Sequence, residues 1–314
     1  MAESDELEGT GFAFIINLAR MIDAPEMEVA PGMVLAAATD EQIAKIKRAL
    51  PNIATPLTVD KGDAWEFGSP ISFDAKRARL SRDEYRYFVV RFSGSMLKVG
   101  RLQAAFDISP VDLEIGVTIF ESGKSANGQQ WSPARFNQTL DGYMRRNVFL
   151  EAISDDMSLV AECFRLLQER APHDVNVQRA VRQLGDLKAL PRTSALTFLG
   201  CFAVLESLLT HEPKPNDPYS SITRQVKTKL ALLNSRFDRP IDYSPFSQVA
   251  ADKVWTKMYD YRSSIAHGAE PDFIRELMLL NNAQVAQHLL AQTTKSVVRQ
   301  ALREPQLLAD LRNC

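Results

Sequence analysis

Cysteine is scarce in this sequence of 314 residues, and its spacing excludes a disulfide framework. The cysteines are Cys163, Cys201 and Cys314, an odd number at wide separations and without a Cys-x-x-Cys motif. Small secreted domains are typically rich in paired cysteines, whereas chains of the reducing cytoplasm are not. The sequence therefore predicts a cytoplasmic protein without structural disulfides.

The common motifs of nucleotide, metal and serine-hydrolase chemistry are also absent. The chain has no GxxxxGK[ST], no GxGxxG after a predicted strand, no HExxH and no GxSxG. Its histidines are scattered and lack the spacing of zinc ligands; they are His173, His211, His267 and His288. We therefore expect no metal site and no cofactor, and the sequence argues against a metalloenzyme or a Rossmann dehydrogenase.

The sequence has neither a strong charge of one sign nor a long hydrophobic run. Thirty-seven Lys and Arg against 39 Asp and Glu give a net charge of −2, so no overall basic character indicates nucleic acid. No Lys or Arg precedes Arg20, although a secretory signal begins with positive charge. Polar residues interrupt the charge-free stretch 277–294, which makes its insertion into a bilayer costly. We expect a soluble protein with no membrane partner.

Residues 1–138 combine helical and strand patterns, which predicts an α+β domain with a mainly antiparallel sheet. Residues 11–20 are apolar and fit either a strand or the start of a short helix. Residues 33–39 predict a strand, and residues 41–50 predict a helix capped by Thr39 or Asp40. Aromatic and β-branched residues predict further strands at 84–91, 102–108 and 113–120.

Residues 139–314 predict an all-α domain of roughly six helices. The segment 194–210 is the most apolar helical pattern of the chain, so we expect this helix at the centre of the core. The proline-rich stretch 212–218 predicts a loop. The helical patterns cover residues 140–169, 174–187, 194–210, 222–235, 246–267, 272–294 and 295–302.

One segment of this half combines a cation with a titratable imidazole. Residues 255–268 have the sequence WTKMYDYRSSIAHG, a helical pattern that we expect Gly268 to end in the left-handed conformation. Arg262 and His267 are separated by about 140° around the helix axis and by roughly 7.5 Å along it. We therefore expect both side chains at the exposed end of one helix.

This segment and the apolar helix before it resemble the HEPN superfamily, in particular its Apea-like branch. The resemblance covers about residues 140–310 and rests on LESLL at 205–209, a proline-rich loop, a basic helix and YRSSIAHG at 261–268. It implies an all-α HEPN-like helical bundle that forms a homodimer, in which the Arg-x4-His motifs of both protomers face a shared cleft. It also implies a metal-independent endoribonuclease of the defence or toxin type.

The implied chemistry suits the residues of the motif. RNA supplies its own nucleophile, the 2′-OH, so the protein needs to provide only proton transfer and charge stabilisation. His267 is the expected general acid or base, and Arg262 is expected to stabilise the phosphate oxygens in the transition state. The expected products are a 2′,3′-cyclic phosphate and a 5′-OH. Active members often carry Asn, Asp or His after the arginine, where this chain has Ser263 as a weaker polar group.

Other residues are candidates for supporting or binding roles. Glu206 lies at the edge of an apolar stripe and needs a cationic partner, which we expect to be Arg262 or another cation across the helix interface. Asp260 could orient His267, or it could be an exposed helix carboxylate. Basic residues exceed acidic ones in the segment 219–257, which could follow an RNA backbone or form a solvated helix face. The RNA-binding candidates are Arg224, Lys227, Lys229, Lys257 and Tyr261.

The sequence leaves three functions open. The first is the ribonuclease, with residues 1–138 as a sensor or regulatory domain for an unknown trigger. The second is a non-catalytic HEPN-like scaffold for dimerisation or for binding RNA or nucleotides. The third is a protein-interaction adaptor without a nucleic-acid role. For Arg262 and His267 the alternative to catalysis is a purely structural helix terminus, where the histidine meets the helix dipole and the arginine stem covers apolar surface.

Overall fold

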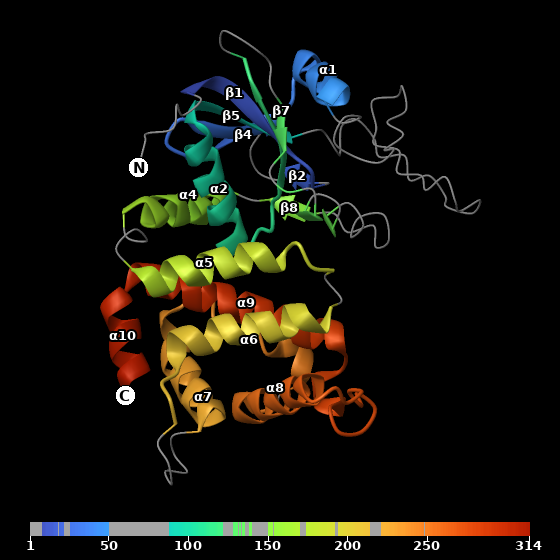
Figure 1. Ribbon diagram of the computed structural model, residues 1–314, viewed down its shortest axis with the longest axis vertical. Coiled ribbons are helices and arrows are strands. Elements are labelled where there is room, and N and C mark those ends of the chain that lie inside the picture. The colour runs from blue at the N-terminus through green and yellow to red at the C-terminus, as the bar shows by residue number, and fades with distance from the viewer. Residues whose placement is uncertain are drawn as a thin grey trace, which may run out of the picture. The chain divides into compact units, whose positions relative to one another are not determined.

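The computed structural model (Figure 1) divides into two compact units, residues 1–165 and 166–314, with the boundary inside helix α4 (Ser154–Glu169). None of the helices in the described ranges has the length and apolarity needed to cross a membrane. The structure describes residues 8–17, 19–21, 26–49, 88–121, 128–130, 132, 134–135, 138–139, 150–152, 154–169, 174–191, 194–213, 221–247 and 249–314.

The first unit is built on an antiparallel sheet, as the sequence predicts. Strand β1 (Glu8–Ile15) lies between β5 (Phe88–Ser95) and β6 (Ile115–Phe120), and the strand order is β3-β4-β5-β1-β6-β7. The remaining strands of this sheet are β3 (Glu26–Ala30), β4 (Met33–Ala37) and β7 (Gly128–Gln130). A separate parallel pair joins β2 (Ala19–Met21) to β8 (Leu150–Ala152).

Strand β1 occupies the centre of the sheet because its residues are apolar on both faces. Phe12, Ala13 and Phe14 are all fully buried. Gly11 approaches β6 so closely that a Cβ atom at this position would overlap the carbonyl oxygen of Ile119. A glycine is therefore required where β1 meets its neighbour. Of the two alternatives for residues 11–20, the structure selects strands.

In the first unit one predicted helix is confirmed and one predicted strand is wrong. Helix α1 (Asp40–Ala49) is present where the sequence predicts it. The predicted strand 102–108 is instead the second half of helix α2 (Met96–Ile108). Val99, Leu102 and Phe106 are buried at a spacing of three and four residues, which is a helical period. The window 102–108 was too short to show that period, and its aromatic residue favoured a strand.

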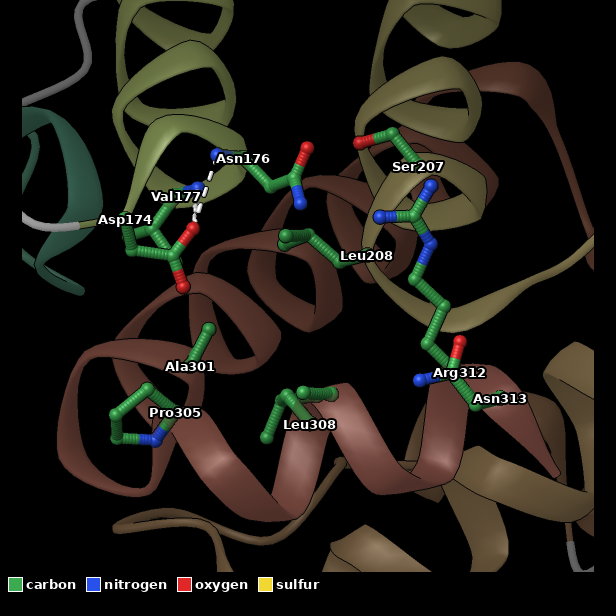
Figure 2. Close-up of a pocket in the computed structure, with 11 residues that line it drawn as sticks. Asp174, Asn176, Val177, Ser207, Leu208, Ala301, Pro305, Leu308, Arg312 and Asn313 are labelled. Atoms are coloured by element: carbon green, nitrogen blue, oxygen red, sulfur yellow. Dashed lines mark hydrogen bonds between the residues drawn. The ribbon is translucent and has the colours of Figure 1, made fainter.

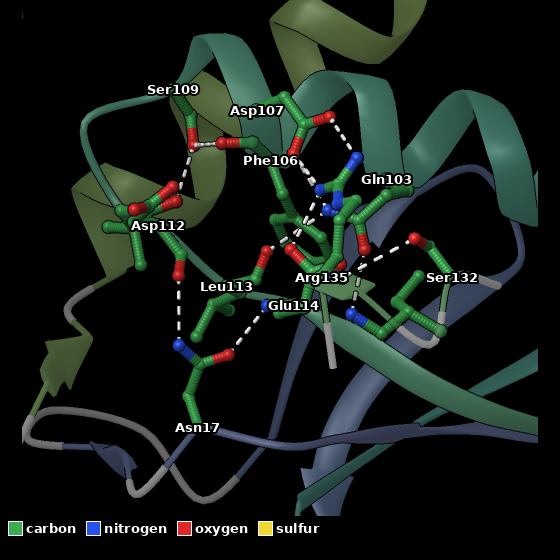
Figure 3. A network of polar contacts seen from close by, with 12 residues as sticks. Asn17, Gln103, Phe106, Asp107, Ser109, Asp112, Leu113, Glu114, Ser132 and Arg135 are labelled. Atoms are coloured by element: carbon green, nitrogen blue, oxygen red, sulfur yellow. Dashed lines mark hydrogen bonds and ion pairs between the residues drawn. The ribbon is translucent and has the colours of Figure 1, made fainter. Parts of the chain in front are cut away.

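A buried ionic cluster joins the end of α2 to the start of β6 (Figure 3). Arg135 Nη2 lies 2.7 Å from Asp107 Oδ1 and 2.7 Å from Glu114 Oε2. Gln103 donates to Asp107 and accepts from the backbone N–H of Ile115. Buried carboxylates require such partners, because an unpaired charge in the core is very costly.

Helices account for most of the second unit. Asp174 caps α5 (Val175–Leu187), Ser194 caps α6 (Ala195–Leu209), and α7 (Ile222–Leu233) begins where predicted. Further along the chain are η3 (Asn234–Arg236), η4 (Ser244–Phe246), α8 (Ala251–Ala266), η5 (Met278–Leu280), α9 (Ala283–Arg303) and α10 (Pro305–Asn313). Helix α6 packs against α5, α7, α8, α9 and α10, which confirms its predicted central place (Figure 1).

Four predicted helices have different bounds in the structure, and one of them, predicted at 246–267, begins only at Ala251 as α8. Residues 272–282 form turns and η5, and α9 is continuous through the predicted break at 294/295. Asn282 explains the late start, because its side chain accepts from the backbone N–H of Val285 and caps α9. Within the predicted helix 140–169, α4 begins only at Ser154, and β8 precedes it. Residues 140–149, like residues 84–87 of a predicted strand, lie outside the described residues.

Candidate functional site

The end of helix α8 has the geometry that the motif sequence predicts. Gly268 has a φ of 70°, the left-handed conformation that glycine adopts without strain. Its N–H donates to the carbonyl of Ile265 at 3.1 Å, and the N–H of Ala269 donates to Ser264 at 2.9 Å. This pair of hydrogen bonds is the Schellman motif, which satisfies the last carbonyls of a helix. The helix therefore ends sharply at His267.

His267 is the last residue before this turn, and it is exposed. Its backbone N–H donates to the carbonyl of Ser263 at 3.0 Å, which fixes the position of the residue. Among the described residues, nothing forms a hydrogen bond or an ion pair with its imidazole. The backbone of His267 is thus fixed, and its exposed side chain is accessible to a ligand.

Arg262 lies one turn earlier and contacts α6. Its Nη2 atom is 3.1 Å from Glu206 Oε2, so the predicted pairing of these two residues is present. Its guanidinium carbon lies 6.0 Å from the centroid of the Phe202 ring, a cation–π distance. The arginine side chain is 35% exposed and that of Glu206 only 14%. The guanidinium therefore contacts α6 through Nη2, its Nε is buried without a hydrogen-bond partner, and about a third of the side chain remains exposed.

Tyr259 completes the surroundings of Glu206. The tyrosine hydroxyl donates to Glu206 Oε1 at 3.2 Å, so both oxygens of the carboxylate have a donor. Burial and the neighbouring Glu206 carboxylate raise the pKa of the Tyr259 phenol, which keeps it protonated as a donor at neutral pH. The sequence did not reveal this contact, because helical spacing does not identify a partner on another helix.

Tyr261 anchors α8 instead of presenting a surface for bases. Its ring is 6% exposed and packs 4.3 Å from the Phe198 ring and 5.0 Å from the Phe273 ring, measured between centroids. A buried ring has no free face on which a nucleotide could stack. Tyr261 therefore positions the motif by packing, and the structure does not bring it to the surface as an RNA contact.

The remaining candidates have separate surroundings. Asp260 is exposed and pairs with Lys257 at 2.8 Å, a contact that does not involve His267. Lys227 pairs with Asp252 at 2.6 Å. Lys229 is buried, and this burial lowers the pKa of its ammonium group. Arg224 and Ser263 are exposed, as is Asp260. The structure does not combine these residues into one uncompensated basic surface.

Among residues that the structure describes, no group of three or more His, Cys, Asp or Glu side chains is arranged to hold a metal ion. The comparisons with family models, curated proteins and solved structures find no match for this chain.

Proposed function

We propose that the second unit is a HEPN-like, metal-independent endoribonuclease whose site comprises Arg262 and His267. The observation that supports it is the pairing of an exposed imidazole with a braced, partly exposed guanidinium at the end of one helix. A phosphodiester needs a proton donor or acceptor and a fixed cation, and these two side chains supply both. Arg262 and His267, which can serve as the fixed cation and as the proton donor or acceptor, are also the two residues of the Arg-x4-His motif on which the resemblance rests.

The reaction begins with attack of a ribose 2′-OH on the adjacent phosphorus. His267 accepts the hydroxyl proton as the 2′-oxygen bonds to phosphorus, and Arg262 stabilises the charge on the non-bridging oxygens. The bond from phosphorus to the 5′-oxygen then breaks, and a protonated imidazole donates the proton that this oxygen requires. The products are a 2′,3′-cyclic phosphate and a 5′-OH. In a homodimer, the second His267 supplies the acid while the first acts as base.

Glu206 serves as a positioning residue in this proposal. The planar guanidinium of arginine donates in a fixed fork, so a carboxylate on one edge determines where the other edge points. Glu206 itself is fixed by Tyr259. The negative charge of Glu206 also reduces the net positive charge of the site. Arg262 therefore stabilises the phosphate mainly through correctly oriented hydrogen bonds and less through long-range attraction. The first unit, in this proposal, senses or regulates, and the bundle forms the dimer.

Cleavage of a fluorescently labelled single-stranded RNA in EDTA tests the proposal. We expect cleavage by the wild-type protein and a rate at least ~100-fold lower for His267→Ala, the magnitude typical of a lost general acid or base. The matched control is His288→Ala, which removes an exposed histidine from α9. The 2′-deoxy version of the oligonucleotide should not be cleaved because it lacks the nucleophile. Undiminished cleavage by both His267→Ala and Arg262→Lys would refute the site.

A non-catalytic RNA-binding scaffold is the second candidate, and one observation favours it. Arg262 already has a carboxylate and an aromatic ring as partners, which is sufficient for a structural ion pair. Salt-sensitive retention of the RNA without any cleavage selects this candidate, since phosphate contacts weaken as counterions compete. Absence of both retention and cleavage would instead favour an adaptor of protein interactions.

A further inference from the structure

A pocket in the helical unit lies between the start of α5, the end of α6 and the helices α9 and α10 (Figure 2). It has about 560 Å³ of empty space, including its open mouth. Its floor is apolar and consists of Val177, Leu208, Ala301 and Leu308, all of them buried. A ligand with an apolar body would therefore replace water on this floor.

Arg312 stands at one side of the pocket and has one side-chain and one backbone contact. Its Nε donates to the carbonyl oxygen of Thr210 at 3.4 Å, and its own carbonyl oxygen lies 2.9 Å from His211 Nδ1. The carbonyl can only accept, so this nitrogen of His211 carries the proton. The two terminal nitrogens of Arg312 have no partner among the described residues, and Figure 2 shows the guanidinium extending toward Ser207. They remain available for an anionic group.

Asp174 stands on the opposite side, beyond the apolar floor (Figure 2). Its Oδ1 accepts from the backbone N–H groups of Asn176 and Val177, which fixes the carboxylate as the cap of α5. Its Oδ2 accepts from none of the residues that the structure describes. Asp174 and Arg312 form no ion pair with each other, so the pocket presents separate negative and positive groups with an apolar surface between them.

We propose that this pocket binds a small zwitterion with an ammonium group at one end, a carboxylate at the other and an aliphatic chain between them. The carboxylate pairs with the terminal nitrogens of Arg312, and the ammonium group donates to Asp174 Oδ2. The aliphatic chain lies on Leu208 and Leu308. The site is independent of the end of α8, so it stands or fails separately from the ribonuclease.

Three probes separate the contributions, measured by titration calorimetry on the full chain at pH 7. They are 6-aminohexanoate, hexanoate without the ammonium group, and hexylamine without the carboxylate. We expect 6-aminohexanoate to bind at least ~10-fold more tightly than either, because each charge-assisted hydrogen bond contributes about that factor. Equal affinities for the three probes, or no binding of 6-aminohexanoate at millimolar concentration, would overturn the proposal.

Substitutions then locate the bound probe. Arg312→Gln should weaken 6-aminohexanoate by about 10-fold and leave hexylamine unchanged, and Asp174→Asn should leave hexanoate unchanged. Ala309→Phe should abolish binding of all three probes, because Ala309 lines the pocket and a phenylalanine side chain there would occupy it. Ala309 is exposed, so we expect the variant protein to fold. Arg275→Gln is the matched control, since it removes an exposed arginine outside the pocket. Binding that resists both Arg312→Gln and Ala309→Phe contradicts the assignment.

Discussion

Arg135 in the sheet unit and Arg262 in the helical unit both bind carboxylates, but their surroundings differ. Arg135 is 13% exposed and pairs with two carboxylates that are each 4% exposed. Arg262 is 35% exposed and has one carboxylate, which a tyrosine also binds. The surroundings of Arg135 leave little of its side chain accessible to a ligand. Those of Arg262 leave about a third of its side chain accessible. Burial and the ratio of charges thus distinguish a structural arginine from one that can act on a substrate.

Removal of Arg135 should produce the largest loss of stability. In Arg135→Ala, Asp107 and Glu114 lose the Arg135 guanidinium, and breaking a buried pair in this way costs about 3–5 kcal/mol. Arg262→Ala is the matched comparison and should cost less, about 1–2 kcal/mol, because the arginine is partly exposed to solvent and Tyr259 still donates to Glu206. Urea unfolding measures the total loss in the free energy of unfolding for each variant.

Hydrogen exchange measured by mass spectrometry assigns that loss to one unit. Faster exchange in β5 and β6 of Arg135→Ala, with α6 unchanged, is the expected pattern. If the two variants lose similar stability, burial does not distinguish the two arginines.

A third arginine, Arg299, adds pH dependence to the comparison. Its Nε lies 2.8 Å from Asp238 Oδ2 at the buried face of α9, and Arg303 approaches the same oxygen at 3.6 Å. Burial alone raises the pKa of Asp238, but the hydrogen bond and charge of Arg299, with the charge of Arg303, outweigh it and lower the pKa.

A lowered folded-state pKa means that the stabilisation by Asp238 is complete above the ordinary aspartate pKa and is lost as pH falls through the folded value. We therefore expect Asp238→Asn to lower the free energy of unfolding at pH 6. The difference from wild type should shrink as the pH approaches 3. Urea unfolding across this range measures it. A difference that stays constant with pH contradicts the assigned charge interaction.

Local signals in the sequence were sufficient for most of the helices and for one contact of the site. Apolar periodicity gave the bounds of α5 and α6 closely, and the structure shows Asp174 and Ser194 as their caps. A cationic partner for Glu206 followed from a general rule, because a carboxylate beside an apolar stripe needs a cation, and the structure selects Arg262 from the alternatives.

Contacts between segments that are distant along the chain were not predictable in the same way. Nothing in the periodicity connects Arg135 to Asp107, or Arg312 to Asp174, because loops of different length determine which helix ends meet. The buried Lys229 illustrates the converse error. Its charge suggested a surface position, but its place on the inner face of α7 took precedence.

The smallest expected effect is that of Gly268→Ala, which distinguishes the contribution of the backbone at the end of α8 from that of its side chains. In Gly268→Ala the new Cβ would meet nothing within 4 Å, so the only cost is the left-handed conformation, about 1 kcal/mol. We expect the free energy of unfolding to fall by about this amount, while RNA cleavage changes little if the Schellman turn persists. A much larger loss of cleavage than of stability would mean that the turn itself, and not only Arg262 and His267, contacts the substrate. Parallel urea unfolding and cleavage rates for Gly268→Ala and His267→Ala distinguish the two cases.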